Sequence, residues 1–468
     1  MTASVVPIGK RSEAQRPAIK APTEPAALPF SELNGWGLYP VVQGRQRLSE
    51  DLEQITDGAA LSRGLGRSYG DASLPASRED VVANSRLANR VLAFDADSGI
   101  LRAEAGLSLL DLNRLTWPRG WVTPVSPGTQ YVTLGGMVAA DVHGKNHHVE
   151  GCFGAHVTRL RLRVASGDIV ECSPQREAEL FRATVGGMGL TGHILEVEVR
   201  LKKVPTAWIW QRTERFANLE TMIERLKEAG ETWPYTMCWV DLLAGGEALG
   251  RGIMAVGRWA EPHEAPDRPP TRKSTITLPI MMPSWLGMPW TVRLFNQATY
   301  TLCGPRVREG IIHPQAFFYP LDVVLEWNRL YGRRGFTQYQ CILPLNEDRS
   351  RPRRFLELVR DLGGTVYVCV MKDCGAEGQG MLSFPKPGIT FAMDLPIDRR
   401  TQSIVDALNE RLIEEGGRIY LAKDAFTRAE HFRAMEPRLA AWERVRRKWD
   451  PEGRLRSVQS VRIFGDQA

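Results

Sequence analysis

Two glycine-rich stretches, widely separated in the chain, constrain this sequence more than any other feature. Residues 64–71 read GLGRSYGD, and the second stretch contains residues 126–129 (SPGT), 133–136 (TLGG) and 143–148 (HGKNHH). Glycine lets the backbone approach a ligand closely, and successive backbone N–H groups in such turns form a concavity that binds anions. The two stretches together predict one extended diphosphate cofactor, held from two sides.

Two other interpretations of the glycines stay open. The nicotinamide-binding fingerprint is GxGxxG between a strand and a long helix, whereas the spacing from Gly64 is GxGxxxG. The residues that follow, 71–75 (DASLP), are typical of a turn and do not start an amphipathic helix. The simplest alternative is a pair of ordinary glycine turns without any ligand.

Composition sets broad limits on the fold and on the partners. A chain of 468 residues is too long for one hydrophobic core, so we expect two domains. A hydrophobic content of 43% and a charged content of 24% are typical of a soluble globular protein. The net charge of +6 is spread over 60 basic and 54 acidic residues, which is weak evidence for nucleic acid. It fits a phosphate-bearing substrate or an anionic membrane surface equally well, and we expect no nucleic-acid partner.

The cysteines and the N-terminus bear on the compartment. The seven cysteines include no CxxC pair and are odd in number, so neither a metal site nor a full set of disulfides is expected. Residues 1–30 are rich in Pro and Ala, are expected to be disordered, and lack the apolar run of a secretory signal. No stretch has the ~20 apolar residues that span a bilayer. We expect a cytoplasmic protein, peripheral at the inner membrane, with a periplasmic location as the alternative.

Hydrophobic periodicity predicts short helices and strands in a mixed order. Strands are expected at 58–63, 91–94, 100–105, 157–164, 169–172, 194–201, 208–212, 338–345 and 365–371. Helices are expected at 109–116, capped by Ser108, and at 176–183, 218–229, 353–362, 404–415 and 432–449. This mixture predicts an α+β layer architecture.

The motifs carry a family resemblance. Residues 64–71, 126–129, 133–136 and 186–192 (GGMGLTG) resemble the FAD domain of vanillyl-alcohol-oxidase-type flavoenzymes. Within that superfamily, residues 143–148 and 422–424 (AKD) resemble the decaprenylphosphoryl-β-D-ribose 2′-oxidases, the flavin half of a two-protein epimerase. The resemblance runs from about Asn34 to about Ile463 and so covers nearly the whole chain.

The resemblance implies a two-domain flavoprotein. An FAD-binding domain of two α+β subdomains would be interrupted by an inserted substrate domain with an antiparallel sheet and flanking helices. The expected boundaries are 1–30 for the tail, 31–206 for the FAD-binding domain, 207–417 for the substrate-binding domain and 418–468 for a C-terminal segment that returns to the FAD domain.

The resemblance also implies the residues that hold FAD. Many relatives tether the flavin through a histidine in the first glycine loop, and the corresponding positions here are Ser68 and Tyr69, so we expect FAD to be non-covalent. The diphosphate is expected on the N–H groups of residues 64–70 and 133–136. The expected cofactor residues are Gly64, Leu65, Gly66, Arg67, Ser68, Tyr69, Gly70, Gly128, Thr133, Leu134, Gly135, Gly136, Ala140, His143, Gly189, Ile194 and Tyr420.

Alcohol oxidation needs a group that takes the hydroxyl proton. Lys423 is the first candidate, because an amine buried beside an apolar flavin face has a lowered pKa and can act as a base or stabilise an alkoxide. An ordinary ion pair between Lys423 and Asp424 is the alternative. His143 and Tyr69 are rival proton acceptors.

The substrate phosphate needs cations, for which Lys145 and Lys372 are candidates. Gln338 and Gln340 alternate on a predicted strand, so both face one side and are expected to bind sugar hydroxyls or the flavin edge. Trp239 is expected to line the pocket. Mycobacterial members of the family place a cysteine in the sugar pocket where this chain has Ala392, so trapping of inhibitors by a thiol is not expected here.

Residues 278–290 are apolar but broken by Pro and Gly, so neither a regular helix nor a central strand is expected there. They are either a loop packed on the core or a mobile flap that touches a lipid or a membrane. In the second case Arg268, Arg272 and Lys273 would lie near phosphate head groups.

The leading functional hypothesis is an FAD-dependent oxidase or dehydrogenase of the CH–OH group. It would oxidise the ribose 2′-hydroxyl of a polyprenyl-phosphate sugar to a ketone, with quinone or oxygen as electron acceptor. A separate NAD(P)H-dependent short-chain reductase would then complete the epimerisation to arabinose for envelope polysaccharide. The alternatives are an FAD-dependent oxidase of a free sugar, alditol or aldonolactone, and a flavoprotein subunit without turnover.

Overall fold

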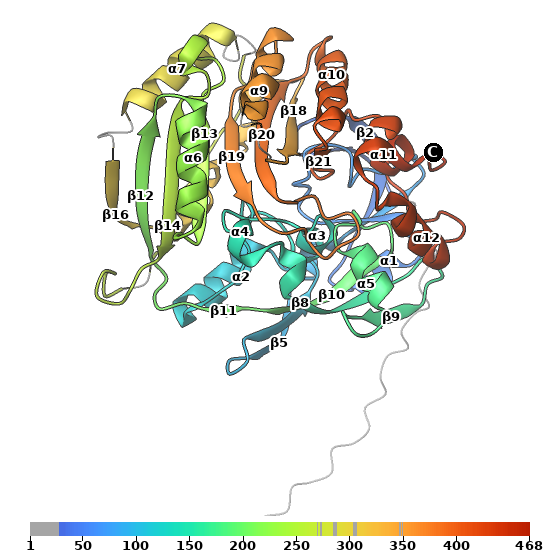
Figure 1. Cartoon of the computed structure of the whole chain (residues 1–468). Coiled ribbons are helices and arrows are strands. Elements are labelled where there is room, and N and C mark those ends of the chain that lie inside the picture. The colour runs from blue at the N-terminus through green and yellow to red at the C-terminus, as the bar shows by residue number, and fades with distance from the viewer. Residues whose placement is uncertain are drawn as a thin grey trace, which may run out of the picture.

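The computed structural model describes residues 28–268, 270–271, 274–283, 288–302, 307–345, 348 and 350–468. Residues 1–27 of the expected disordered tail, Arg272, Lys273 and Cys303 lie outside the described residues. The fold is α+β, as the sequence predicts, and Figure 1 shows helices and sheets interleaved along the chain. The division into two domains stays a prediction.

Two small sheets are built from the first two hundred residues. The four-stranded sheet has the order β1 (Phe30–Asn34), β2 (Val41–Leu48), β4 (Val81–Asn84) and β3 (Leu61–Arg63), with β2, β4 and β3 parallel. The five-stranded antiparallel sheet has the order β5 (Val91–Asp95), β6 (Ile100–Glu104), β10 (His193–Arg200), β8 (Val157–Arg163) and β9 (Ile169–Cys172). The first glycine stretch follows directly after β3.

Short helices connect these strands. They are α1 (Leu52–Thr56), α2 (Leu109–Thr116), α3 (Leu134–Ala139), α4 (His147–Glu150) and α5 (Ala178–Thr184). The bounds of α2 and its predicted cap are confirmed, because the Ser108 side chain accepts a hydrogen bond from the Asp111 N–H at 3.0 Å. The sequence TLGG starts α3, with Thr133 as its N-cap.

A large antiparallel sheet occupies the upper left of Figure 1. Its order is β16 (Val307–Ile312), β12 (Ile209–Phe216), β14 (Gly252–Trp259), β13 (Tyr235–Val240), β19 (Cys369–Cys374), β20 (Gly388–Pro396), β18 (Phe336–Leu343) and β21 (Arg418–Ile419). The helices α6 (Leu219–Gly230), α9 (Arg351–Asp361) and α10 (Thr401–Glu414) cover one face of this sheet (Figure 1).

The two faces of the large sheet differ in polarity because side chains alternate along each strand. The face beneath the helices carries buried apolar side chains that join one hydrophobic core, among them Tyr339, Met371, Phe391 and Met393. The residues between them, including Gln338, Gln340, Lys372 and Ala392, point to the opposite face. The predicted sharing of one side by Gln338 and Gln340 is therefore confirmed.

The C-terminal part is helical, but not as one helix. The predicted helix 432–449 is wrong: α11 (Ala429–Met435) ends before Pro437 and α12 (Leu439–Trp449) begins after it, because proline lacks the N–H that a continuous helix needs. The last helix is α13 (Val458–Phe464). These helices contact the first part of the chain: Trp442 Nε1 donates to the carbonyl of Ala183 at 3.0 Å and the Val458 N–H donates to Leu74 O at 2.9 Å.

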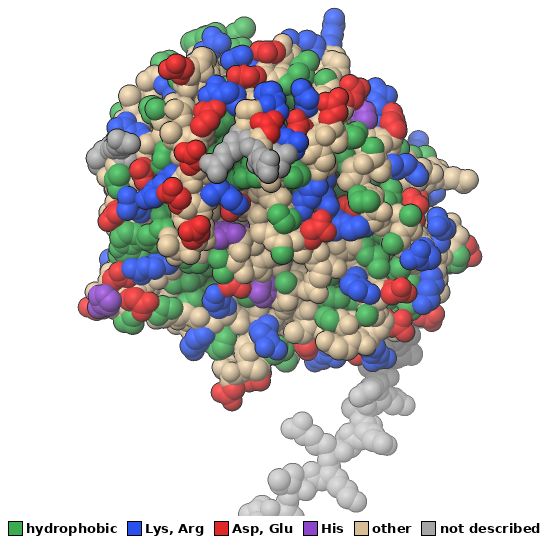
Figure 2. Space-filling view, viewed as in Figure 1, with side chains coloured by type: hydrophobic (Ala, Val, Ile, Leu, Met, Phe, Trp, Pro, Cys, Tyr) green, Lys and Arg blue, Asp and Glu red, His purple; other side chains and the backbone are tan. Residues whose placement is uncertain are grey.

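The remaining elements are short sheets and two further helices. The strands β7 (Trp121–Val122) and β11 (Lys202–Lys203) pair, as do β15 (Ile276–Thr277) and β17 (Val324–Leu325). The helices are α7 (Pro289–Leu302) and α8 (Pro314–Phe318). No helix among the described residues is both long and apolar enough to cross a membrane. On the face drawn in Figure 2, basic and acidic side chains are interspersed.

Candidate active site

A cavity of about 300 Å³ is lined by residues from all three larger sheets. Ser62 of β3, Ile194 of β10 and Gln338 of β18 contribute one wall each, and the two glycine stretches lie between these walls. Segments that are far apart in the sequence thus meet at one place, and that place is where the predicted site residues gather.

Most of the predicted cofactor residues line this cavity. They are Gly64, Leu65, Gly66, Arg67, Ser68, Tyr69, Gly128, Thr133, Gly135, Gly136, Ala140, His143, Gly189, Ile194 and Tyr420. Two predicted residues do not. Leu134 is fully buried in the hydrophobic core, because it is the first residue of α3 and its side chain packs inward. Gly70 lies against the carbonyl of Asp424 and not against the cavity.

Glycine occupies the positions of the cavity wall for different structural reasons. A Cβ at Gly64 would collide with the Thr133 side chain, so the two glycine stretches touch only because this position has no side chain. Gly128 and Gly189 line the cavity, and apart from their chain neighbours no atom of the described residues lies within 4 Å of a Cβ built there, so a side chain would occupy the open space itself. This is the arrangement expected where a ligand lies directly on the backbone.

The amides of the two glycine stretches are used differently. Leu134 N donates to Leu107 O and Gly135 N donates to Ala105 O, both within 2.9 Å. The prediction that these two N–H groups bind the diphosphate is therefore wrong, since both are occupied by protein carbonyls. In the first stretch, by contrast, the N–H groups of Leu65, Gly66 and Arg67 have no acceptor among the described residues.

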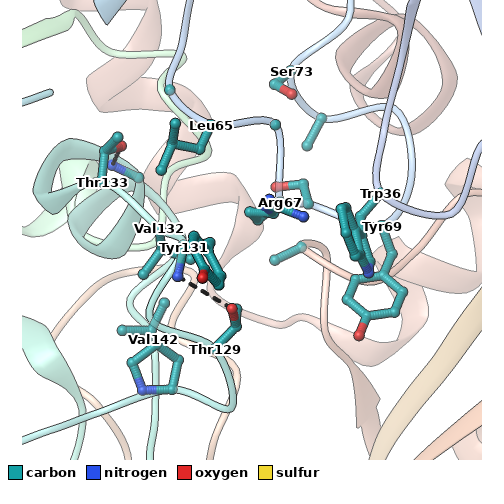
Figure 3. A pocket seen from close by; sticks show the side chains of 18 of the residues that line it. Trp36, Leu65, Arg67, Tyr69, Ser73, Thr129, Tyr131, Val132, Thr133 and Val142 are labelled. Carbon is teal, nitrogen blue, oxygen red and sulfur yellow. Dashed lines mark hydrogen bonds between the residues drawn. The ribbon is translucent and has the colours of Figure 1, made fainter. Parts of the chain in front are cut away.

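Aromatic rings hold the Arg67 side chain in the cavity. Its guanidinium lies 3.8 Å from the centroid of the Trp36 ring and 5.4 Å from that of Tyr131, and Figure 3 shows it between the two rings. Burial lowers the pKa of Arg67 from its ordinary value, and its Nε has no hydrogen-bond partner among the described residues. A buried and incompletely paired guanidinium favours the binding of an anion.

Lys423 is positioned by the first glycine stretch. The Tyr69 N–H donates to Ala422 O at 2.9 Å, and Gly70 allows the carbonyl of Asp424 to approach. Arg462 of α13 donates to Asp71 at 2.9 Å and to Asp424 at 2.8 Å, and so joins the two segments by charge. The alternative that Asp424 is simply the ion partner of Lys423 is wrong, because Asp424 pairs with Arg462.

The Lys423 ammonium lies 3.7 Å from the centroid of the Tyr69 ring and faces the cavity. Burial lowers its pKa to about 7, against the opposing attraction of the Asp394 carboxylate, and the charge of Lys372 lowers it further. Asp394 accepts hydrogen bonds from Gln338 at 2.5 Å and from the Tyr331 hydroxyl at 2.7 Å. Burial raises the pKa of Asp394 to about 6.

A chain of hydrogen bonds sets the protonation of His143. The Thr390 hydroxyl donates to Cys341 O at 2.8 Å, so it can only accept from the Gln340 amide, whose Nε2 lies 3.4 Å away. The same Nε2 therefore donates to His143 Nε2 at 2.9 Å, which leaves the ring proton of the neutral histidine on Nδ1. His143 Nδ1 is buried and has no partner within the described ranges, and burial holds the pKa of the ring well below its usual value.

The register of the large sheet explains which predicted substrate residues meet. Ala392 of β20 lies opposite Gln340 on one side and Val370 on the other, and Lys372 lies opposite Thr390. Residues directly opposite in an antiparallel sheet share a face. Gln338, Gln340, Lys372 and Ala392 all line the cavity, and burial lowers the pKa of Lys372.

Two predicted substrate residues lie outside the cavity lining. Trp239 lies opposite Val370 in the sheet and is separated from the cavity by it, so its prediction as a lining residue is wrong. Lys145 is buried behind the wall and donates to Phe318 O at 2.8 Å. Burial lowers its pKa to about 7, and its nearby charge adds to that of Lys372.

Sequence reasoning missed several residues of the site. The cavity is also lined by Trp36, Met188, Asp322 and Trp327. Asp394 lies behind this lining and accepts a hydrogen bond from the lining residue Gln338. The alternation of side chains along a strand could have identified Asp394, because it follows Ala392 by two residues on the same strand and so faces the same side. The described residues contain no group of three or more His, Cys, Asp or Glu side chains that could hold a metal ion.

Comparison with known proteins adds independent information. Residues 56–173 match the model of the FAD binding domain family. The chain is 34% identical over 411 residues to decaprenylphosphoryl-β-D-ribose oxidase of Mycolicibacterium smegmatis. The aligned residues cover 86% of this chain and 88% of that relative.

More distant similarities centre on a smaller part of the chain. D-arabinono-1,4-lactone oxidase of Yarrowia lipolytica is 24% identical over 236 residues, which cover 50% of this chain and 40% of the relative. Human Δ(24)-sterol reductase is 28% identical over 111 residues, 24% of this chain and 22% of the relative.

Proposed function

This chain belongs to the decaprenylphosphoryl-β-D-ribose oxidase family of FAD-dependent oxidoreductases, and we propose that it oxidises the 2′-hydroxyl of a polyprenylphosphoryl-β-D-ribose to the 2′-ketone. The observation that carries this proposal is the meeting of the glycine stretches with two buried amines, those of Lys423 and Lys372, in one cavity. The glycines supply a bed for the cofactor, and the amines supply a proton acceptor and a cation for a phosphate.

The residues around the cavity fit FAD. Gly128 and Gly189 leave open space in the cavity, and the N–H groups of Leu65 and Gly66 have no acceptor in the part of the chain that the structure describes. Together they form a cradle for a ligand. Bound FAD supplies the hydride acceptor of the reaction. We propose that it is held without a covalent bond, because the first glycine stretch offers Ser68 and Tyr69 where a tethering histidine would stand. Acid precipitation tests this: the flavin should remain in the supernatant, and flavin in the pellet would contradict it.

Lys423 is the proposed proton acceptor. With a pKa of about 7, a substantial fraction of its amine is neutral at neutral pH and can take the proton of the 2′-hydroxyl. The two rivals fit less well. The pKa of the Tyr69 hydroxyl is raised well above its usual value by burial, so this group stays a phenol. His143 has its Nε2 lone pair engaged by Gln340 and a proton on Nδ1, so it serves as a donor.

The large sheet would orient the sugar. Gln338 and Gln340 present amides on the cavity face, and Ala392 between them and Val370 leaves room for the ring. Lys372 faces the cavity and is the proposed cation for the phosphate, while the charge of the buried Lys145 strengthens the positive potential behind it. Binding a phosphate here would also reduce the electrostatic repulsion that Lys372 exerts on Lys145 and Lys423.

The proposed product needs further chemistry to become arabinose. A 2′-ketone is reduced with the opposite stereochemistry by a hydride donor, so we propose an NAD(P)H-dependent short-chain reductase as the partner enzyme. Quinone or oxygen is the proposed acceptor of the electrons from reduced flavin. We propose the cytoplasmic face of the inner membrane as the place of reaction, with the periplasmic face as the alternative.

Anaerobic mixing with farnesylphosphoryl-β-D-ribose tests the proposal. The flavin absorbance should bleach with this lipid and not with free ribose, an alditol or an aldonolactone at the same concentration. Bleaching by a free polyol, with none by the lipid, would instead assign the protein to the oxidases of free sugars. Farnesylphosphoryl-β-D-arabinose is the matched control, since it differs only in the configuration at C2.

A further inference from the structure

The apolar side chains most exposed on this protein are concentrated in one short part of the chain. The six highest exposures among large apolar residues, from 58% to 81%, all fall between residues 276 and 302. They belong to Ile276, Ile280, Trp290, Leu294, Phe295 and Leu302. Scattered exposed apolar residues are ordinary, whereas a group of this size marks an interaction site.

Four of these six side chains share one side of α7. Trp290, Leu294, Phe295 and Leu302 are spaced so that they fall on one face of the helix. The opposite face holds the buried Val292 and Asn296, and Asn296 donates to the Asp241 carboxylate at 2.8 Å. The helix is thus fixed to the sheet by one face, and it turns its larger apolar face outward.

The sequence that contains α7 is basic between Asp267 and Glu309. From Arg268 to Arg308 the sequence has no acidic residue and six basic residues: Arg268, Arg272, Lys273, Arg293, Arg306 and Arg308. The net charge of the whole chain is +6, so this segment carries as much net positive charge as the entire protein. An apolar helix face with Trp, Phe and Leu, set in basic sequence, is the signature of a helix that lies in the interface of an anionic membrane.

Residues that precede α7 pair with residues that line the cavity. Ile276 and Thr277 of β15 pair with Val324 and Leu325 of β17, and both β17 residues line the cavity. The Met282 N–H donates to Arg329 O at 2.9 Å, and α7 begins at Pro289, so the chain holds the first residue of α7 within about 25 Å of this contact. The start of α7 is therefore tethered to a segment that packs against one wall of the cavity.

We propose that the outward face of α7, formed by Trp290, Leu294, Phe295 and Leu302, docks on the surface of an anionic lipid bilayer. The apolar side chains enter the head-group boundary, and Arg293 on the same helix contacts lipid phosphates. The positive charge of the flanking sequence adds long-range attraction that is screened by salt. This proposal does not depend on the identity of the substrate, because it rests on the surface of α7 and on the charge of its flanking sequence.

Sedimentation with vesicles tests the proposal on the full-length holoenzyme. The wild-type protein should pellet with vesicles of equal parts phosphatidylcholine and phosphatidylglycerol, and less with pure phosphatidylcholine or in high salt. The double variant Leu294→Ser/Phe295→Ser should bind the anionic vesicles at least about tenfold more weakly, and Arg293→Glu should weaken binding at low salt. The matched control is Leu115→Ser, because Leu115 is also exposed. It belongs to α2, which lies at the lower left of Figure 1, whereas α7 lies at the upper left.

Three results would overturn the proposal: wild-type protein that stays in the supernatant, a double variant that pellets like the wild type, or equal binding to both kinds of vesicle. A wild-type dimer that Leu294→Ser/Phe295→Ser dissociates in sedimentation velocity would instead assign this face to a second copy of the chain. The double variant should still show flavin bleaching with the short farnesyl substrate. Membrane docking by α7 and oxidation of the substrate are therefore tested by separate measurements, and one proposal can fail while the other holds.

Discussion

The Lys423 ammonium lies 3.7 Å from the centroid of the Tyr69 ring, although the two residues come from opposite ends of the chain. The hydrogen bond from the Tyr69 N–H to Ala422 O holds the first glycine stretch against the segment that carries the lysine. This backbone contact, together with the Arg462 bridge between Asp71 and Asp424, fixes the proposed base against the proposed cofactor cradle. A change at either segment is therefore expected to affect both.

Replacing the proposed base should stop the chemistry and spare the cofactor. In Lys423→Met, anaerobic flavin reduction by farnesylphosphoryl-β-D-ribose should slow by about 10²- to 10⁴-fold, because a positioned proton acceptor contributes rate enhancements of that size. The FAD content should stay at the wild-type value. Lys448→Met on α12 is the control for the loss of one positive charge. Unchanged bleaching in Lys423→Met would remove this residue from the mechanism.

The pH profile reports which form of Lys423 acts. Burial lowers its pKa to about 7, so the amine is mostly protonated below pH 7 and mostly neutral above it. If the neutral amine is the base, the second-order rate constant for flavin reduction rises through pH 7 and then levels off. In Asp394→Asn the inflection should move to lower pH, because the carboxylate that favours the ammonium is gone. A rate that falls through pH 7 would show that the charged form acts, as an electrostatic stabiliser.

The Thr390–Gln340–His143 chain predicts a single tautomer of His143. Nitrogen-15 NMR of histidine-labelled protein should find the proton of His143 on Nδ1, since Gln340 donates to Nε2. Thr390→Val removes the acceptor that orients the Gln340 amide and should yield a mixture of tautomers. Thr337→Val, at a buried threonine of the neighbouring strand β18, serves as the control. A proton found on Nε2 in the wild type would refute this assignment.

Arg462 should contribute strongly to the stability of the fold. It bridges the buried carboxylates of Asp71 and Asp424, so Arg462→Met leaves two buried carboxylates without their cation. Removing one partner of a buried pair costs about 3–5 kcal/mol of unfolding free energy, measurable by urea denaturation of the apoprotein. The exposed Arg454→Met is the control and should change the unfolding free energy by about 1 kcal/mol or less. A loss in Arg462→Met no larger than in the control would contradict the role of this bridge.

The local elements of the fold could be predicted from sequence, because their signals are local. The cap at Ser108 and the alternation that puts Gln338 and Gln340 on one side depend on neighbouring residues only. The predicted helix 432–449 was wrong for a reason that was also visible in the sequence, since Pro437 interrupts it. The helix α7 was not predicted, although Pro289 stands at its first turn, where proline is favoured.

The site residues that sequence reasoning misjudged depend on long-range pairing. Leu134 and Gly135 lie in a glycine stretch, yet their N–H groups are used by Leu107 and Ala105, whose approach no local pattern indicates. Trp239 falls outside the cavity because Val370, which belongs to a strand far along the chain, lies between Trp239 and Ala392 in the sheet. Asp394 was overlooked, and its importance comes from Gln338 and Tyr331, which reach it from other segments.

An isotope effect on flavin bleaching tests the central claim most directly. Farnesylphosphoryl-β-D-ribose carrying deuterium at C2 should bleach the flavin several-fold more slowly than the unlabelled lipid, because the C2–H bond breaks in the step that reduces the cofactor. The lipid with deuterium at C3 should react at the unlabelled rate. Equal rates for all three lipids, or a slowing only with deuterium at C3, would contradict oxidation at the 2′-position by this enzyme.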